Sequence, residues 1–178
     1  GNMAPVIFGA RTISDQVTFD TRIPMRVVVI DLENFESVRE FETDPGAIIH
    51  FGNAYESGDT IIVDGMFQDN FEANETLSDV FNSDNRFGGG YYYRYKLNMV
   101  TGAMSREQVV ETESEFPTFN PRYAQQRNQY TYTACSIPNE ADSFFNGIAK
   151  VDDEGGAETI TLDQGYYGSE PVFAPRVG

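Results

Sequence analysis

The sequence has no tryptophan, a single cysteine and a single histidine among its 178 residues, and only 12 lysines and arginines. One cysteine excludes an internal disulfide and any zinc or iron–sulfur site built from paired thiols. One histidine excludes an all-histidine metal cage within this chain alone. The 28 acidic residues leave a net charge of −16, which argues against nucleic-acid binding and against docking on an anionic membrane surface. Apolar runs such as Val27–Ile30 are far too short to cross a bilayer.

The apolar residues occur instead in short stretches bounded by Gly, Asp, Asn and Pro, and aromatic residues are plentiful, with 14 Phe and 10 Tyr. This pattern is typical of β-strands. Two segments depart from it: Asp69–Val80 predicts a helical turn, and the glycine-rich Ser83–Gly90 predicts a flexible loop. The predicted strands are Met25–Ile30, Val38–Glu42, Ala47–Gly52, Thr60–Val63, Tyr91–Leu97, Glu107–Glu113, Tyr130–Cys135, Phe145–Val151 and Glu158–Leu162.

A hairpin-like unit recurs along the chain. In each copy an apolar strand ends in Asp31, Asn98 or Asp152, a tight turn follows, and a second strand begins. Such recurrence is typical of β-propellers, in which each blade is one small antiparallel sheet. Ordinary hairpins remain the alternative, because Asx and Gly turns are common between strands. The chain holds about three such units, too few to close a propeller ring.

The only histidine, His50, is the starting point for chemistry. In the segment Ile48–Gly52, period-two alternation places its side chain on the face opposite Ile49 and Phe51. A lone histidine in a strand can also be a satisfied structural residue. No Gly-x-Ser-x-Gly turn presents a serine, and Cys135 lies in a β run without a nearby base, which favours a buried structural thiol over a nucleophile.

The residues around His50 belong to a series of motifs along the chain. The series resembles the carotenoid cleavage oxygenase family, which includes apocarotenoid oxygenases, lignostilbene dioxygenases and the retinoid isomerase of the eye. Its members carry a histidine followed closely by Asn-Ala and an acidic residue, and then a strand ending in Asp. The motifs, in the family's order, are His50–Glu56 with Asp59–Gly65, Tyr93–Tyr95 with Thr101 and Gly102, Glu115–Tyr123, Gly147–Asp152 and Glu170–Arg176.

The resemblance implies a fold and a metal. The fold is all-β, with about three antiparallel blades of a seven-bladed β-propeller, so that residues 1–178 form a single segment of an unclosed ring. The metal is a non-haem Fe(II) on the propeller axis, held by four histidines from different blades. His50 matches the third of these in chain order, so the others are expected before Gly1 and after Gly178. Neutral imidazoles suit Fe(II) and leave coordination positions open for O2 and substrate.

Two glutamates are implied to orient the iron ligands. The nitrogen of a metal-bound imidazole that does not touch the metal normally donates to a carboxylate, which fixes the tautomer and aims the ring. Glu115 and Glu170 match the family's glutamates, and we expect Glu115 to bond His50 and Glu170 to serve the fourth histidine. The alternative for either is a solvated acid among many, although the apolar residues next to both make full exposure less expected.

For the parent protein, the family's function is that of an oxidoreductase. The dioxygenase splits one conjugated C=C bond of a carotenoid or apocarotenoid with O2 and gives two carbonyl products. We expect the 178-residue chain alone to be inactive and to retain iron poorly, because three of the four ligand histidines are absent. Exposed blade edges favour self-association. No charged and apolar leader opens the chain, so we expect a cytoplasmic location, with membrane-peripheral attachment and plastid import left open.

Two other classes of function stay open. The chain could be a non-enzymatic β module that binds Ca2+, a glycan or a basic protein partner through its acidic face and its tyrosines. It could also be a propeller scaffold that has lost its metal. An enzyme segment predicts a buried His50 imidazole in contact with Glu115. A binding module predicts an exposed histidine and a tyrosine-lined groove elsewhere.

Overall fold

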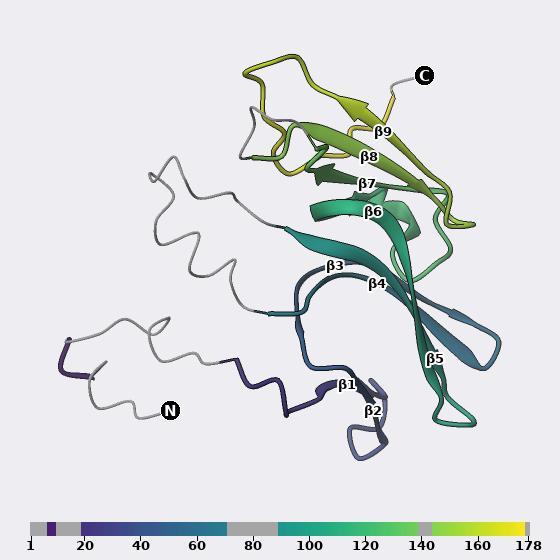
Figure 1. Cartoon of the computed structure of the whole chain (residues 1–178). Coiled ribbons are helices and arrows are strands. Elements are labelled where there is room, and N and C mark those ends of the chain that lie inside the picture. The colour runs from purple at the N-terminus through teal and green to yellow at the C-terminus, as the bar shows by residue number, and fades with distance from the viewer. Residues whose placement is uncertain (1–6, 10–18, 71–88, 139–143, 177–178) are drawn as a thin grey trace.

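The computed structural model describes residues 7–9, 19–70, 89–138 and 144–176, and it is built from β-strands (Figure 1). No helix in this described part is long and apolar enough to cross a membrane. A short 3₁₀ turn, η2 (Pro121–Tyr123), is capped by the Asn120 side chain. The strands are β1 (Met25–Ile30), β2 (Val38–Thr43), β3 (Ala47–Ser57), β4 (Thr60–Gln68), β5 (Gly90–Asn98), β6 (Met104–Phe119), β7 (Tyr130–Cys135), β8 (Gly147–Asp152) and β9 (Ala157–Thr161).

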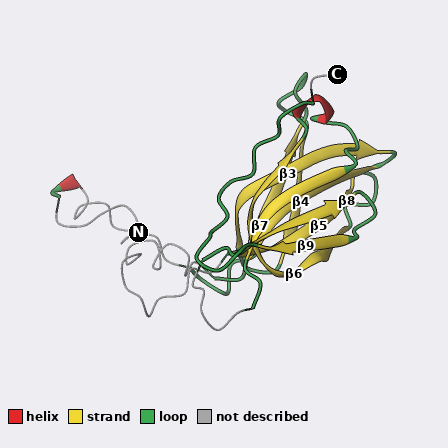
Figure 2. Ribbon diagram, turned by 90° about the horizontal axis from the view of Figure 1, so that it is seen from above, coloured by secondary structure: helices red, strands yellow, loops and turns green. Residues whose placement is uncertain are grey.

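The strands form an antiparallel meander. β1 and β2 make a two-stranded sheet, and β3 to β9 make a seven-stranded sheet in which each strand pairs with its neighbour in sequence. Figures 1 and 2 show the seven strands as one continuous twisted layer, and Figure 1 shows the β1–β2 hairpin beside one end of it. The all-β antiparallel fold predicted from the sequence is therefore confirmed.

Strand β6 divides the large sheet into two four-stranded units. Its first part, Met104–Ser114, pairs with β5, whereas Ser114–Phe119 pairs with β7. One unit is therefore β3–β6 and the other β6–β9, joined through a single long strand. Four antiparallel strands are the size of one propeller blade. With the β1–β2 hairpin, this arrangement agrees with about three blades or parts of blades.

The recurring turn residues act as predicted. The Oδ1 atoms of Asp31, Asn98 and Asp152 each accept hydrogen bonds from two backbone N–H groups of the turn that follows. These Asx turns close the hairpins β1–β2, β5–β6 and β8–β9. One carboxylate oxygen of Asp152, Oδ1, is thus engaged by its own turn.

The core lies where β4 to β8 pack side chains on one another. Its fully buried members include Met66, Tyr92, Val110, Cys135 and Val151. The prediction that Cys135 is a buried structural thiol is confirmed, and burial raises the pKa of that thiol. The outermost strand, β9, is exposed along its whole length.

Three strands extend at least five residues beyond their predicted bounds. The predicted strands Ala47–Gly52, Thr60–Val63 and Glu107–Glu113 are parts of β3, β4 and β6. Bulges in β3 and β6 break the period-two pattern that sequence reasoning follows, and the strands continue beyond them. The predicted helical turn Asp69–Val80 lies outside the described residues, apart from bends at its first two positions. Gly90, which the glycine run predicts to lie in a flexible loop, is the first residue of β5.

Candidate metal-ligand site

His50 on β3 and Glu115 on β6 meet across the sheet. The Nδ1 atom of His50 lies 2.8 Å from Oε2 of Glu115. Because an ionised carboxylate only accepts hydrogen bonds, Nδ1 carries the proton in this contact. The predicted hydrogen bond is therefore confirmed. Within the described part of the chain, Nε2 has no hydrogen-bond partner, so its lone pair is free for a ligand.

Irregularities in two strands aim these side chains. Between Ile48 and Phe51, β3 has one residue more than the facing stretch of β4, so His50 lies in a β-bulge. Between Glu115 and Thr118, β6 has a second bulge, in which Phe116 adopts a positive φ of 60°. Bulges re-aim side chains and are frequent beside functional sites. Simple alternation is therefore interrupted at the position where sequence reasoning applied it to His50.

The two partners differ in burial. The Glu115 side chain is 5% exposed, whereas the His50 side chain is 43% exposed. The prediction of a buried imidazole is therefore wrong, because only the Nδ1 side of the ring is covered. The Phe116 ring, 5.0 Å from the imidazole centroid and tilted by 53°, packs beside it and in turn meets Phe145 edge-on at 6.0 Å.

The second oxygen of Glu115 is also fully engaged. Oε1 accepts hydrogen bonds from Nε2 of Gln68 at 3.0 Å and from the backbone N–H of Gly90 at 3.1 Å. His50, Gln68, Gly90 and Glu115 come from β3, β4, β5 and β6, so four adjacent strands each contribute one group to this cluster. Sequence reasoning missed Gln68 and Gly90. The only signal was the glycine run before β5, which it took for flexibility.

Glu170 is far from these residues in the sequence, and its surroundings differ from theirs. It follows β9 in a segment without regular structure and is exposed, as is the neighbouring Val172. The expectation that flanking apolar residues would shield it is wrong for this chain. Its orienting role toward another histidine stays a prediction.

The possible metal-ligand atoms of this chain can be compared with what an iron site needs. An imidazole with a free Nε2 and a carboxylate on Nδ1 is the arrangement found in histidine metal ligands. His50 therefore fits as one ligand. In the described residues, however, no group of three or more His, Cys, Asp or Glu could hold a metal ion, and the sequence contains no second histidine. His50 alone does not make a closed site.

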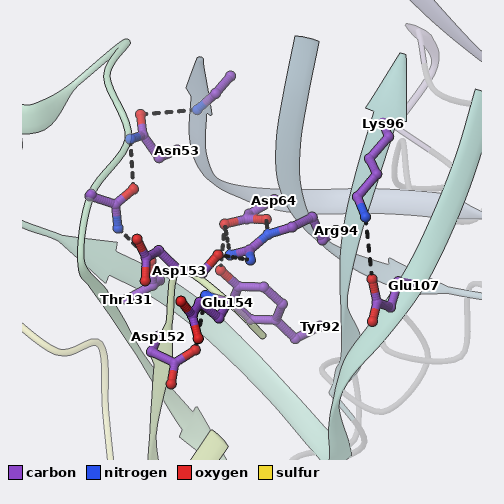
Figure 3. Close-up of polar contacts among 12 residues, drawn as sticks. Asn53, Asp64, Tyr92, Arg94, Lys96, Glu107, Thr131, Asp152, Asp153 and Glu154 are labelled. Atoms are coloured by element: carbon purple, nitrogen blue, oxygen red, sulfur yellow. Dashed lines mark hydrogen bonds and ion pairs between the residues drawn. The ribbon is translucent and has the colours of Figure 1, made fainter. Parts of the chain in front are cut away.

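A second polar cluster lies deeper in the same sheet (Figure 3). Asp64, 2% exposed, accepts hydrogen bonds from Nε and Nη2 of Arg94 at 2.9 and 3.2 Å and from the Tyr92 hydroxyl at 2.8 Å. Nη1 of Arg94 reaches the backbone carbonyl of Asp153 in the β8–β9 turn at 2.9 Å. This cluster therefore links the two four-stranded units.

The ionisation of this cluster follows from burial and from its one carboxylate. Burial raises the pKa of Tyr92 well above its usual value, and the charge of Asp64 raises it further. Burial by itself lowers the pKa of Arg94, but the hydrogen bond and the charge of Asp64 outweigh burial and raise it. The cluster therefore consists of an ion pair and a neutral phenol, which is a structural arrangement rather than a proton-transfer site.

Asn53, three residues after His50, fixes β3 to a distant loop. Its Nδ2 atom donates to the carbonyls of Tyr123 and Gln126 and to Oδ1 of Asn128 at 2.7–3.0 Å. Its Oδ1 accepts from the backbone N–H of Gln125. The Asn-Ala part of the motif therefore holds the strand that carries His50, and does not itself contact the imidazole.

Residues 2–178 match the family model described as RPE65, retinal pigment epithelial membrane protein. The chain belongs to this family. It is 26% identical over 181 residues to apocarotenoid-15,15'-oxygenase of Synechocystis, covering 99% of this chain and 36% of that protein. It is 28% identical over 150 residues to the carotenoid 9,10(9',10')-cleavage dioxygenase of Crocus sativus, covering 78% of this chain and 27% of that protein. The family member described here therefore spans about a third of these relatives or less.

Solved structures share the fold. The cobalt-substituted ACO of Synechocystis superposes with a TM-score of 0.85 at 21% identity, covering 98% of this chain and 37% of that one. A point variant of the same enzyme gives a TM-score of 0.81 at 20% identity, covering 99% of this chain and 37% of that one. These enzymes are β-propellers, so the propeller fold predicted for this family member is confirmed.

Proposed function

We propose that this chain is part of a carotenoid or apocarotenoid dioxygenase in which His50 is one of the iron ligands. The whole protein would split one conjugated C=C bond with O2 and give two carbonyl products. The observation that carries the proposal is the 2.8 Å hydrogen bond between His50 and Glu115, formed by residues far apart in the sequence. The relatives, which are named as carotenoid and apocarotenoid oxygenases, support the substrate class.

In that reaction, this chain would supply the imidazole of His50 and hold it in position for the metal. Glu115 accepts a hydrogen bond from the Nδ1–H group of His50. In the neutral ring this leaves Nε2 unprotonated and able to bind a metal. The bulge in β3 turns the ring out of the regular strand pattern, and Phe116 limits its rotation. When bound, a non-haem Fe(II) ion would supply the redox chemistry that joins O2 to the alkene.

His50 is the only histidine of this chain, so any further histidine ligands of the iron must come from another part of the protein. A single imidazole does not compete with water for Fe(II) strongly enough to retain it. The isolated 178-residue chain is therefore expected to hold no stoichiometric iron and to leave carotenoids intact. Glu170 would take part only beside a histidine that this chain does not contain.

The test uses the whole protein, with iron content and loss of carotenoid colour as readouts. His50→Ala should abolish both. Glu115→Gln should lower iron affinity or turnover by about 10- to 100-fold, as expected for a partner that orients a ligand. Glu107→Gln, which changes an exposed acid on the same strand as Glu115, is the matched control and should change neither readout.

Two outcomes would contradict the proposal. Full cleavage by the His50→Ala variant would remove His50 from the site. Stoichiometric iron and cleavage in the isolated chain would overturn the need for further histidines. A non-enzymatic module would instead show Ca2+, glycan or basic-protein binding that His50→Ala leaves unchanged.

We also propose a cytoplasmic protein that self-associates through exposed strands when it is not closed into a ring. The exposed β9, in which Ile160 is 67% exposed, supports the self-association. Sedimentation of the isolated chain should show species larger than a monomer, and Ile160→Lys should reduce them. A fluorescent fusion of the whole protein in a plastid or at a membrane would contradict the proposed location.

A further inference from the structure

We propose that Gln68 is a positioning residue for His50, acting through Glu115 together with the backbone N–H of Gly90. This inference rests on the proposed function, because it concerns how the free Nε2 of His50 is kept available. Neither residue touches the imidazole. Both bind the oxygen of Glu115 that His50 does not use.

The two carboxylate oxygens of Glu115 have different hydrogen-bond partners. Oε1 takes the two donors, Gln68 Nε2 at 3.0 Å and the Gly90 N–H at 3.1 Å, and Oε2 takes the imidazole at 2.8 Å. With Oε1 held from two directions, rotation of the carboxylate would break two hydrogen bonds to a charged group. Such bonds are among the stronger ones in proteins. Oε2 is thereby fixed in the direction of Nδ1.

Burial makes Gln68 dependent on this contact. Gln68 is 7% exposed and Glu115 is 4% exposed, so neither can exchange its partner for bulk water. A carboxylate accepts and cannot donate, so the Gln68 amide must present its nitrogen to Oε1. A buried amide without a partner would lose its hydrogen bonds to water and gain none from the protein.

The close approach of β4 and β5 favours glycine at position 90. A Cβ there would lie 3.0 Å from the Phe67 carbonyl oxygen and 3.3 Å from Cγ of Gln68. A side chain at this position would therefore require β4 to give way by a few tenths of an ångström at the point where both strands reach Glu115. Glycine allows the Gly90 N–H and the Gln68 amide to share one carboxylate oxygen.

The tautomer of His50 is the quantity that this arrangement controls. With Oε2 held at Nδ1, the proton stays on Nδ1 and the Nε2 lone pair faces outward. If the carboxylate can rotate away, the proton can move to Nε2, which blocks that nitrogen as a ligand. Gln68 therefore favours the ligand-competent tautomer without contacting the ring.

The test is the imidazole spectrum of the ¹⁵N-labelled 178-residue chain without metal, at a pH where the ring is neutral. Since His50 is the only histidine, its ring signals need no assignment to a residue, and Nδ1 and Nε2 are told apart by their couplings to the ring protons. Gln68→Met, which keeps the size and removes the donor, should raise the ratio of Nε2–H to Nδ1–H tautomer roughly tenfold, the equivalent of one hydrogen bond to a charged group. Gln129→Met makes the same change at an exposed glutamine and should leave the ratio unchanged.

A second measurement needs no variant. In the wild-type chain, the Gln68 side-chain amide protons should exchange with solvent at least about tenfold more slowly than those of exposed Gln129. Equal exchange rates, or a folded Gln68→Met variant with the wild-type tautomer ratio, would overturn the positioning role. Failure of the proposed function is separate: if the whole protein cleaves no carotenoid while Gln68→Met still shifts the tautomer, the positioning role stands and the dioxygenase assignment does not.

Discussion

At the scale of single residues, the sheet contains two kinds of buried carboxylate. Glu115 accepts hydrogen bonds from an imidazole and two amides, and Asp64 is paired with Arg94 and Tyr92. Asp64 thus has a full cationic partner, and it serves the fold. The ring partner of Glu115 is the His50 imidazole rather than an arginine or lysine, and its alignment with His50 is the feature available for chemistry.

Removal of the Asp64 partner should be costly. Arg94→Met leaves a buried carboxylate without its cation, so we expect the free energy of unfolding to fall by about 3–5 kcal/mol. Lys96→Met, on the same strand, breaks only the exposed 3.5 Å pair with Glu107 (Figure 3) and should cost about 1 kcal/mol at most. Urea unfolding measures both.

The combined replacement decides what the pair contributes. Adding Asp64→Leu to Arg94→Met removes the uncompensated charge, so the double variant should be more stable than Arg94→Met alone. A double variant that is less stable than the single one would mean that packing, and not charge, explains the loss.

At the scale of elements, bulges and one side-chain anchor determine where the strands point. β3 carries both His50 and Asn53, and each lies in a stretch where the pairing with β4 slips by one residue. The first slip turns the imidazole toward Glu115. The second places Asn53 against the loop at residues 123–128, which it holds with three donated hydrogen bonds.

Asn53→Asp tests this anchor. The change keeps the shape of the side chain but puts an oxygen against the carbonyls of Tyr123 and Gln126, so these acceptors lose their donor. We expect the free energy of unfolding to fall by about 3 kcal/mol or more, with the loop at 123–128 becoming sensitive to protease first. Asn34→Asp, in an exposed turn where only the side-chain oxygen is used, is the matched control and should stay within about 0.5 kcal/mol.

At the scale of the whole molecule, the free energy of unfolding should fall at alkaline pH. Burial raises the pKa of Tyr92 and of Tyr95, and it raises that of Cys135. In the unfolded chain these groups lose their protons near their usual values, about 10 for tyrosine and 8.5 for cysteine. The folded chain keeps its protons over that range, so the free energy of unfolding should fall as pH rises above about 9.

Urea unfolding between about pH 8 and pH 11 measures this slope. Each group that ionises only on unfolding contributes about 1.4 kcal/mol per pH unit. Tyr92→Phe removes one such group, so its stability should decline less steeply above about pH 10 than that of the wild-type chain. An equal slope in both proteins would show that Tyr92 ionises in the folded state.

Short-range patterns in the amino-acid sequence encode the local features of this chain. Strand identity, the hairpins and the Asx turns at Asp31, Asn98 and Asp152 follow from composition and spacing, because hydrogen bonds within a hairpin join residues near each other in the chain. The family motifs added His50 and its partner Glu115, whose contact is present, and Glu170, whose role stays a prediction.

The contacts between residues far apart in the sequence are set by the folded chain. The register slips that bring His50 to Glu115, the long β6 shared by two four-stranded units, and the reach of Gln68 and Gly90 to one carboxylate oxygen have no local signature. A bulge shifts every following side chain by one position, so its consequence is set by the facing strand and not by the bulged residues. For the same reason the half-exposed imidazole could not be foreseen, since burial depends on which side chains other strands place beside it.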